Sequence, residues 1–235
     1  MTLRAYARLA AAAFWLAGCF VCYSIARPIG RESRWVRRFM RGIGGLLGLR
    51  VTIEGRPKPG HVLYVANHIS WLDILALGGA SEARFIAKDE IARWPLVGSL
   101  ARLGGTVFVS RERRGATRVQ ADAVAAALGE GRPVALFAEG GTGDPSFVRP
   151  FRPALFASAV EAGTPVQPVA IDYGPDRARY AWPDGMSFAD EAKRMLNRAE
   201  PVPVTLRFLP PLDPATLDRK ALAAQSHAGI SSALV

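Results

Sequence analysis

Cysteine and histidine are both scarce in this chain of 235 residues. Its two cysteines, Cys19 and Cys22, lie close together in one apolar segment, so the rest of the chain cannot contain a disulfide framework. The three histidines are widely spaced and have no cysteine near them, which predicts that no zinc is bound. The G-x-S-x-G motif of serine hydrolases and the G-x-x-x-x-G-K-[ST] phosphate loop are also missing.

Acidic residues are nearly absent from the first 50 positions. Residues 1–50 contain nine arginines and one glutamate, a net charge of +8, whereas residues 51–235 contain 21 basic and 19 acidic residues, a net charge of +2. A total of +10 would suit a nucleic-acid partner, but the body of the chain is almost neutral. We therefore expect no nucleic-acid partner. We predict a basic membrane anchor over residues 1–50 and an α/β domain over residues 51–235.

The anchor contains one long apolar run. Residues 9–25, "LAAAAFWLAGCFVCYSI", include no charge and would form a helix of roughly 26 Å, at the short end of a bilayer span. Arginines are more numerous after the run than before it, which predicts a helix in the cytoplasmic membrane with the domain on the cytoplasmic side. A cleaved signal peptide and a buried or half-inserted helix are the alternatives. Residues 34–49 place apolar side chains at helical intervals between arginines, which indicates a basic helix on an anionic membrane surface.

The rest of the chain alternates short apolar runs with helical patterns. Strands that are apolar on both faces and separated by helices indicate an α/β fold, with a mostly parallel sheet covered by helices on both faces. The expected strands are 51–54, 62–66, 84–87, 106–109, 133–138, 166–171 and 202–209. The expected helices are 70–78, 90–103, 115–129, 151–162 and 214–225.

A histidine follows the second of these strands. Asn67-His68 ends the strand, and "SWLDILAL" begins a helix, so His68 is expected at the carboxyl edge of the sheet, where open α/β sheets bind ligands. Asp73 lies on the first turn of that helix and could hydrogen-bond one imidazole nitrogen, which would raise the basicity of the other. Such a dyad would deprotonate a hydroxyl of the substrate. The alternatives are a structural His68 and a capping box formed by Ser70 and Asp73, and the cap is compatible with the dyad.

Four sequence blocks carry a resemblance to a known family. "NHISWLDILAL" contains the pattern N-H-x4-D, and "FIAKDEIARWPLVGSLARLGGTVFVSRERR", "LFAEGGTGDPSFVRPFRPALF" and "VQPVAI" follow it. In this order they resemble the blocks of the glycerolipid acyltransferases, the lysophosphatidic acid acyltransferase family with the H-x4-D motif. The resemblance covers about residues 60–175, and four ordered blocks are far more specific than any one of them.

The resemblance implies an O-acyltransferase. It would move a fatty acyl group from an acyl thioester to the free hydroxyl of a lysophospholipid, with 1-acyl-sn-glycerol-3-phosphate as the expected acceptor and phosphatidic acid as the product. His68 would be the general base and Asp73 would orient it. Membrane lipids, with acyl-CoA or acyl carrier protein as co-substrate, would be the partners, without metal or prosthetic cofactor. The candidate substrate-binding residues of these blocks are Lys88, Arg111, Glu139, Gly140, Gly141, Thr142 and Arg152.

Alternatives remain for three of these candidates. The Glu139 carboxylate could be satisfied by loop amides, a substrate role for Lys88 is no better supported than its absence, and Arg152 is better explained as a solvated residue at a helix start. The glycines after the strand at 133–138 would let backbone N–H groups approach an anion. Arg111 ends another strand, and its guanidinium could bind phosphate through two donors.

The third block departs from the usual P-E-G-T-R or P-E-G-T-T. Ala138 replaces the proline, Gly141 the threonine, and Thr142 occupies the last position, where an arginine is common. Part of the phosphate contact is therefore absent, or Arg149 or Arg152 supplies it. The variant block also resembles the lyso-ornithine lipid acyltransferases, whose acceptor bears no phosphate. An alternative of another class is a catalytically silent, membrane-anchored lipid-binding module, for which a damaged dyad would be the sign.

Overall fold

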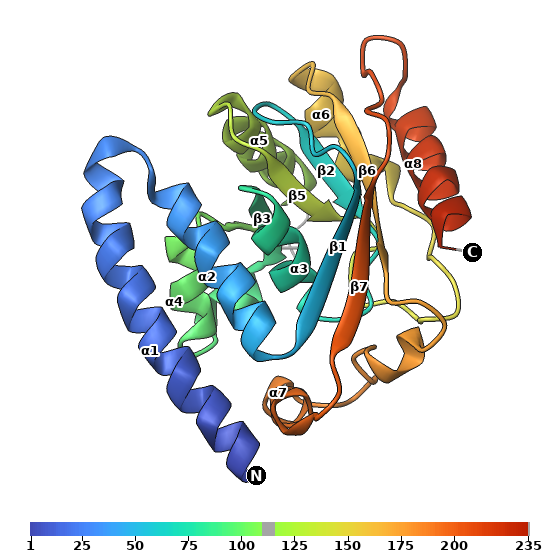
Figure 1. The fold of residues 1–235 in the computed structure, drawn as a ribbon. Coiled ribbons are helices and arrows are strands. Elements are labelled where there is room, and N and C mark those ends of the chain that lie inside the picture. The colour runs from blue at the N-terminus through green and yellow to red at the C-terminus, as the bar shows by residue number, and fades with distance from the viewer. Residues whose placement is uncertain (110–115, 235) are drawn as a thin grey trace. The chain divides into compact units, whose positions relative to one another are not determined.

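The computed structural model describes residues 1–109 and 116–234. In this part of the chain seven strands form one sheet in the order β1-β7-β6-β2-β5-β3-β4 (Figure 1). Strand β2 pairs in parallel with β5 and β6, and β3 pairs in parallel with β4 and β5. The predicted α/β fold with a mostly parallel sheet is confirmed. The strands are β1 (Leu49–Gly55), β2 (Leu63–Ala66), β3 (Arg84–Lys88), β4 (Val107–Val109), β5 (Val134–Phe137), β6 (Val166–Asp172) and β7 (Val202–Phe208).

The helix expected over residues 90–103 is divided in two. A 3-10 helix, η2 (Asp89–Arg93), ends before Trp94-Pro95, and α4 (Val97–Leu103) begins after it. Proline has no backbone N–H and disfavours helical angles in the residue before it, and Trp94 is extended. The α-helices are α1 (Leu3–Ala26), α2 (Glu32–Leu46), α3 (Leu72–Ala80), α4, α5 (Ala116–Gly129), α6 (Ala157–Glu161), α7 (Phe188–Asn197) and α8 (Arg219–Ala233).

Helix α7 was not among the predicted elements. Its start carries a clear signal, because the Ser187 hydroxyl accepts from the backbone N–H of Asp190 at 3.2 Å and donates to the Asp190 carboxylate at 2.7 Å. The S-x-x-D pattern of an N-cap was therefore present in the sequence. Helix α8 begins later than expected, because Asp218 caps it by accepting from the N–H of Ala221.

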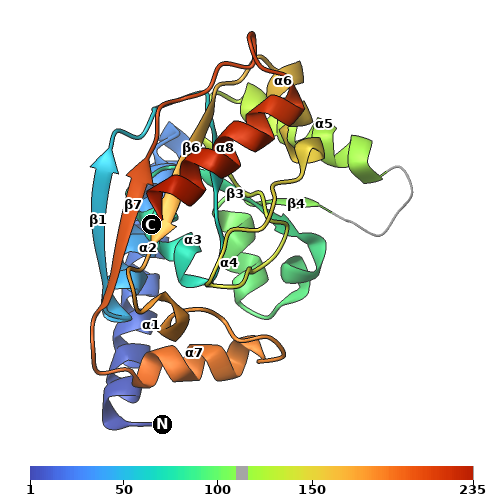
Figure 2. The ribbon, with the colours of Figure 1, turned by 90° about the vertical axis from the view of Figure 1, so that its right-hand side faces the viewer.

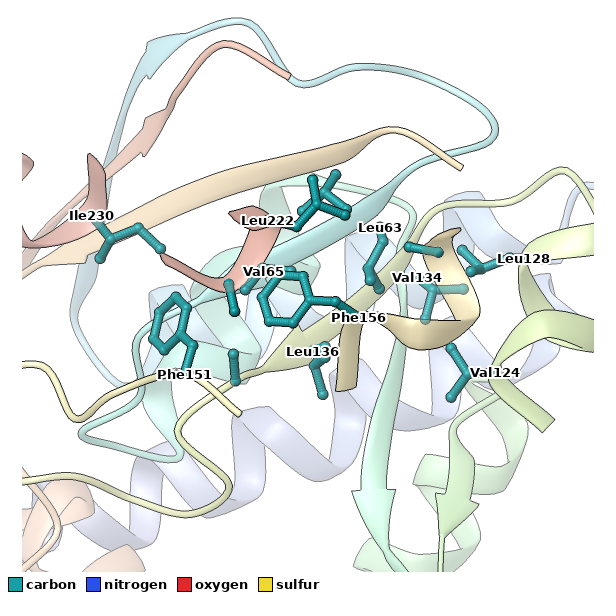
Figure 3. Close-up of a cluster of buried hydrophobic side chains, with 14 of the residues drawn as sticks. Leu63, Val65, Val124, Leu128, Val134, Leu136, Phe151, Phe156, Leu222 and Ile230 are labelled. Atoms are coloured by element: carbon teal, nitrogen blue, oxygen red, sulfur yellow. The ribbon is translucent and has the colours of Figure 1, made fainter. Parts of the chain in front are cut away.

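The chain divides into two compact units, and the predicted division at residue 50 stays a prediction. Unit 2 comprises residues 54–68, 83–171 and 207–235. Strands β2 and β5 fill its centre, α8 covers β6, and α5 and the 3-10 helix η3 (Pro153–Phe156) complete the core (Figures 2 and 3). Burying one such side chain contributes about 1.5–3 kcal/mol. The core side chains labelled in Figure 3 are Leu63, Val65, Val124, Leu128, Val134, Leu136, Phe151, Phe156, Leu222 and Ile230.

Unit 1 comprises residues 1–53, 69–82 and 172–206. Its helices α1 and α2 lie side by side and are joined by a short turn (Figure 1). They approach closely because α2 contains Gly42, where a Cβ would collide with the Trp15 indole. Helix α2 also packs against α3, and a Cβ on Gly79 would lie 3.0 Å from the Cα of Arg41. The predicted basic helix therefore exists and is partly covered within the unit.

The N-terminal end of α1 is bound to α7 within unit 1. The Arg8 guanidinium donates to the carbonyl oxygens of Leu196 at 3.0 Å and Arg198 at 2.8 Å, at the C-terminal end of α7. The backbone N–H of Thr2 donates to the Asn197 side chain at 2.8 Å. Residues 3–29 are long and apolar enough to cross a membrane, with a mean hydropathy of 1.9 over an 18-residue window, and a signal sequence would pass the same test.

Candidate active site

Both backbone polar groups of His68 are bound by the segment that follows β5. The His68 N–H donates to Oε1 of Glu139 at 2.8 Å, and the His68 carbonyl oxygen accepts from the N–H of Gly143 at 2.6 Å. The imidazole stacks on the ring of Phe137, with centroids 3.9 Å apart and an angle of 14° between the planes. Strands β2 and β5 are parallel neighbours, so their carboxyl ends meet at one edge of the sheet. The predicted position of His68 at this edge is confirmed.

Asn67 fixes the end of β2 to the end of β6. Its buried side chain donates to the carbonyl oxygen of Ile171 at 3.0 Å and accepts from the N–H of the same residue at 2.8 Å. The amide side chain thus continues the sheet hydrogen bonding beyond the last paired residue of the strand. Asn67 therefore has a structural role beside His68.

The Asp73 carboxylate is fully buried, with 0% of the residue exposed. Its Oδ2 accepts from the backbone N–H groups of Ile69 and Ser70, each at 2.9 Å. The Ser70 hydroxyl oxygen accepts from the N–H of Leu72 at 3.4 Å. Half of the predicted capping box is therefore present, because Asp73 accepts from the N–H of Ser70, whereas the Ser70 hydroxyl accepts from Leu72 and not from the N–H of Asp73. The catalytic pairing of Asp73 with His68 stays a prediction.

Tyr173 supplies a further contact to this carboxylate. Its hydroxyl donates to Oδ1 of Asp73 at 2.6 Å. Tyr173 was not among the predicted site residues, although it directly follows β6 and therefore lies at the strand end where polar side chains have functional roles. Its place just after a predicted strand was the feature of the sequence that could have identified it.

Glu139 is 5% exposed, and both of its carboxylate oxygens accept from backbone amides. Oε1 accepts from His68, and Oε2 accepts from Arg149 at 3.0 Å. Burial raises the pKa of the Glu139 carboxyl above its usual value, against the opposing effect of these two hydrogen bonds. This is the arrangement in which loop amides satisfy the carboxylate. A contact between Glu139 and a substrate stays a prediction.

The remaining candidates differ in exposure. Gly140 has a φ of 81°, a left-handed conformation that glycine adopts without strain, and Gly141 and Thr142 are half-buried. Lys88 is exposed at the end of β3, a neighbour of β5 in the sheet. Unit 2 therefore brings His68, Glu139, the glycine segment and Lys88 to ends of adjacent strands.

Two arginines complete the set of predicted substrate-binding residues. Arg152 is exposed at the residue before η3, which fits the interpretation as a solvated helix-start residue. Arg111 lies outside the described residues, so its predicted role stays a prediction. Among the described residues, no group of three or more histidine, cysteine, aspartate or glutamate side chains could hold a metal ion.

Comparison with known proteins shows to which family the chain belongs. The family model described as Acyltransferase matches residues 49–172, more than half of the chain. The chain belongs to this acyltransferase family, and it is an enzyme of that class. The matched range includes the H-x4-D sequence and the glycine segment, and it extends to the residue before Tyr173. The predicted membership and enzyme class are confirmed.

Individual relatives extend the match. A lyso-ornithine lipid O-acyltransferase from Brucella abortus (strain 2308) is 40% identical over 214 residues, which cover 82% of this chain and 80% of that protein. A 1-acyl-sn-glycerol-3-phosphate acyltransferase from Neisseria gonorrhoeae is 42% identical over 136 residues, which cover 56% of this chain and 53% of that protein. The crystal structure of the 1-acyl-sn-glycerophosphate (LPA) acyltransferase from Thermotoga maritima is similar in fold, with a TM-score of 0.68, 23% identity and 98% coverage of each chain.

Proposed function

We propose that this acyltransferase transfers a fatty acyl group from an acyl thioester to the free hydroxyl of a lysolipid, with a lyso-ornithine lipid as the acceptor. The observation that carries the proposed reaction is the double hydrogen bonding of the His68 main chain by Glu139 and Gly143. A general base works only if its ring is held in a fixed position, and this arrangement fixes the backbone from which the imidazole projects.

His68 accepts the proton of the acceptor hydroxyl while the hydroxyl oxygen attacks the thioester carbonyl carbon. The C–S bond then breaks, and the leaving thiolate takes the proton from the His68 imidazolium, so no covalent acyl-enzyme forms. Asp73 orients the imidazole and stabilises its cationic form. The backbone N–H groups of Gly140 and Gly143 donate within the protein, to Phe137 and His68. We therefore assign stabilisation of the oxyanion to the N–H groups of Gly141 and Thr142, between them.

Two observations support the lyso-ornithine acceptor. The Brucella relative matches a much longer share of this chain than the Neisseria relative does, at a similar identity. The position of the common phosphate-binding arginine is Thr142, and both oxygens of Glu139 accept from backbone amides. An acceptor without a phosphate needs neither the arginine that Thr142 replaces nor a substrate contact from Glu139.

The second candidate acceptor is 1-acyl-sn-glycerol-3-phosphate. It is the acceptor named for the Neisseria relative, which is 42% identical to this chain over 136 residues. With this acceptor, Arg111 would bind the phosphate through two parallel hydrogen bonds. The donor is acyl-CoA or acyl carrier protein, and the reaction needs no prosthetic cofactor.

The proposed location is the cytoplasmic face of the membrane, with the lipid acceptor taken from the bilayer. Helix α1 presents exposed apolar side chains, including Phe14 at 84% and Ile25 at 71%. Arg8 binds the start of α1 to α7, and the turn at residues 27–31 joins its end to α2. Because both ends are held on unit 1, α1 inserts its apolar face into the membrane without crossing it. The arginines of α2 would contact anionic headgroups.

An acceptor panel tests this proposal. The purified full chain is offered lyso-ornithine lipid, 1-acyl-sn-glycerol-3-phosphate and other lysophospholipids, each with acyl-CoA and with acyl carrier protein. We expect kcat/KM for lyso-ornithine lipid to exceed that for the phosphate-bearing acceptor by at least about 10-fold. The opposite preference would replace the acceptor with the second candidate. No transfer to any acceptor from either donor would overturn the proposed reaction.

A further inference from the structure

The two oxygens of the Asp73 carboxylate accept hydrogen bonds from different groups of unit 1. Oδ2 accepts from the backbone amides of Ile69 and Ser70 and so serves the start of α3. Oδ1 accepts from the hydroxyl of Tyr173, which lies 100 residues away in the sequence. One oxygen therefore accepts the backbone N–H groups at the start of α3. The hydrogen bond from Tyr173 to the other oxygen does not contribute to the helix start.

The Tyr173 contact fixes the plane of the carboxylate. The two amides hold one oxygen, but they alone leave the group able to tilt about that oxygen. A donor on the opposite oxygen, at 2.6 Å, removes this freedom. A carboxylate that orients an imidazole must keep its plane fixed, because a hydrogen bond weakens as its angle departs from linearity.

Tyr173 is itself held firmly. It is 2% exposed, and its ring packs against that of Tyr180 with centroids 5.5 Å apart. The guanidinium of Arg198 lies over the Tyr180 ring at 4.9 Å from its centroid. The turn after β6 is closed by the N–H of Gly174, which donates to the Asp172 carboxylate at 2.8 Å. The hydroxyl is therefore presented to Asp73 by a packed and hydrogen-bonded segment.

We propose that Tyr173 is a positioning residue for acyl transfer, which acts by fixing the Asp73 carboxylate that orients His68. This inference rests on the proposed function of the dyad. Burial, the nearby charge of Asp73 and the hydrogen bond raise the pKa of the Tyr173 hydroxyl well above its usual value of 10.0. The hydroxyl thus stays protonated and remains a donor to Asp73 at pH values below 10.0.

The test compares two substitutions that each remove one tyrosine hydroxyl from a hydrogen bond of the same length. Tyr173→Phe removes the bond to Asp73. Tyr64→Phe is the matched control, because the Tyr64 hydroxyl donates at 2.6 Å to the carbonyl oxygen of Lys58, in unit 2. We expect Tyr173→Phe to lower kcat about 10-fold with KM unchanged, a smaller loss than the roughly 10²-fold or more for removal of the base itself. Tyr64→Phe should leave kcat unchanged.

The pH profile distinguishes positioning from a merely structural role. The Tyr173 hydroxyl bonds directly to the carboxylate that would stabilise the His68 imidazolium, whereas the Tyr64 hydroxyl bonds to a backbone carbonyl in unit 2. The acidic limb of the kcat profile should therefore move in Tyr173→Phe and stay in place in Tyr64→Phe. Site-specific 3,5-difluorotyrosine at position 173 keeps the ring and strengthens the donor, so it should move the limb in the opposite direction. This variant also provides the readout if Tyr173→Phe does not fold.

A double variant completes the test. If Tyr173 acts through Asp73, Tyr173→Phe combined with Asp73→Asn should lose no more activity than Asp73→Asn alone. An unmoved acidic limb in a folded position-173 variant, or losses that multiply in the double variant, would overturn the role of Tyr173. A wild-type enzyme that acylates none of the acceptors would instead overturn the proposed function.

Discussion

The backbone N–H of Gly143 lies 2.6 Å from the carbonyl oxygen of His68, to which it donates. A Cβ added at Gly143 would lie 2.5 Å from Oε2 of Glu139 and 3.3 Å from that same carbonyl oxygen. Position 143 therefore requires glycine, because Glu139 and His68 approach the backbone too closely to leave room for a side chain. The E-G-G-T-G segment supports the main chain of His68, whatever part it has in substrate binding.

This relationship predicts different effects for two glycines of the segment. Gly143→Ala should lower the free energy of unfolding by about 1–3 kcal/mol, because the methyl group overpacks against Glu139 and the His68 carbonyl. Gly141→Ala is the matched control, because a Cβ there meets nothing within 4 Å, and its effect should stay within about 0.5 kcal/mol. Denaturant unfolding of both variants measures the difference. Equal losses would contradict the close approach at Gly143.

Glu139 predicts a pH dependence of stability. Burial raises the folded-state pKa of its carboxyl above the ordinary value of 4.5, so the folded state binds more protons than the unfolded state between those two values. The stability that this group contributes is fully present below pH 4.5 and falls as pH rises through the folded pKa. The free energy of unfolding of the wild type, minus that of Glu139→Gln, should therefore fall as pH rises and then level off.

Urea unfolding of both proteins at pH 4.5, 6.0 and 7.5 measures this trend for Glu139, with the lowest value set at the ordinary pKa. Glu139→Gln should also leave one backbone N–H, that of His68 or Arg149, without its acceptor, because one amide position carries N–H₂. A relative stability that rises with pH would show that Glu139 is more acidic in the folded state than in the unfolded one.

Sequence patterns predicted the strands well because most strands are short apolar runs bounded by polar or turn residues. The carboxyl-edge position of His68 followed from the same pattern. Patterns could not predict that both oxygens of Glu139 bind backbone amides, since Arg149 is ten residues away and the contact depends on the path of the loop. Tyr173 was missed for a similar reason, because its partner, Asp73, lies 100 residues earlier.

The exposed apolar face of α1 predicts a loss of membrane binding in a charged variant. Phe14→Asp combined with Ile25→Asp places two charges on this face, and each opposes insertion into the apolar region of the bilayer. Binding to vesicles that contain anionic lipid should fall, whereas kcat on acceptor dispersed in detergent should stay unchanged. Val51→Asp combined with Ile53→Asp is the matched control, because both are exposed apolar residues of β1. Equal losses of binding in the two variants would contradict a specific role for α1.

The cap and the catalytic role of Asp73 can be separated by substitution. In Asp73→Asn the amide oxygen can still accept from the N–H groups of Ile69 and Ser70, so the start of α3 should be largely retained. Ser70→Ala removes only a long hydrogen bond of 3.4 Å to Leu72, so it should cost about 0.5 kcal/mol, the low end for a cap residue, with turnover intact.

If Asp73 orients His68, Asp73→Asn should lower kcat at least roughly 10²-fold, because the amide favours the wrong imidazole tautomer. His68→Ala should lose a similar amount. The double variant should lose little more than either single variant, because the two residues act as one unit and the second substitution removes a group that no longer functions. Single-turnover rates of the three variants, with unfolding curves to establish that each is folded, give the comparison. Losses that multiply, or an Asp73→Asn enzyme with normal kcat, would leave Asp73 as a helix cap alone and would remove the dyad from the mechanism.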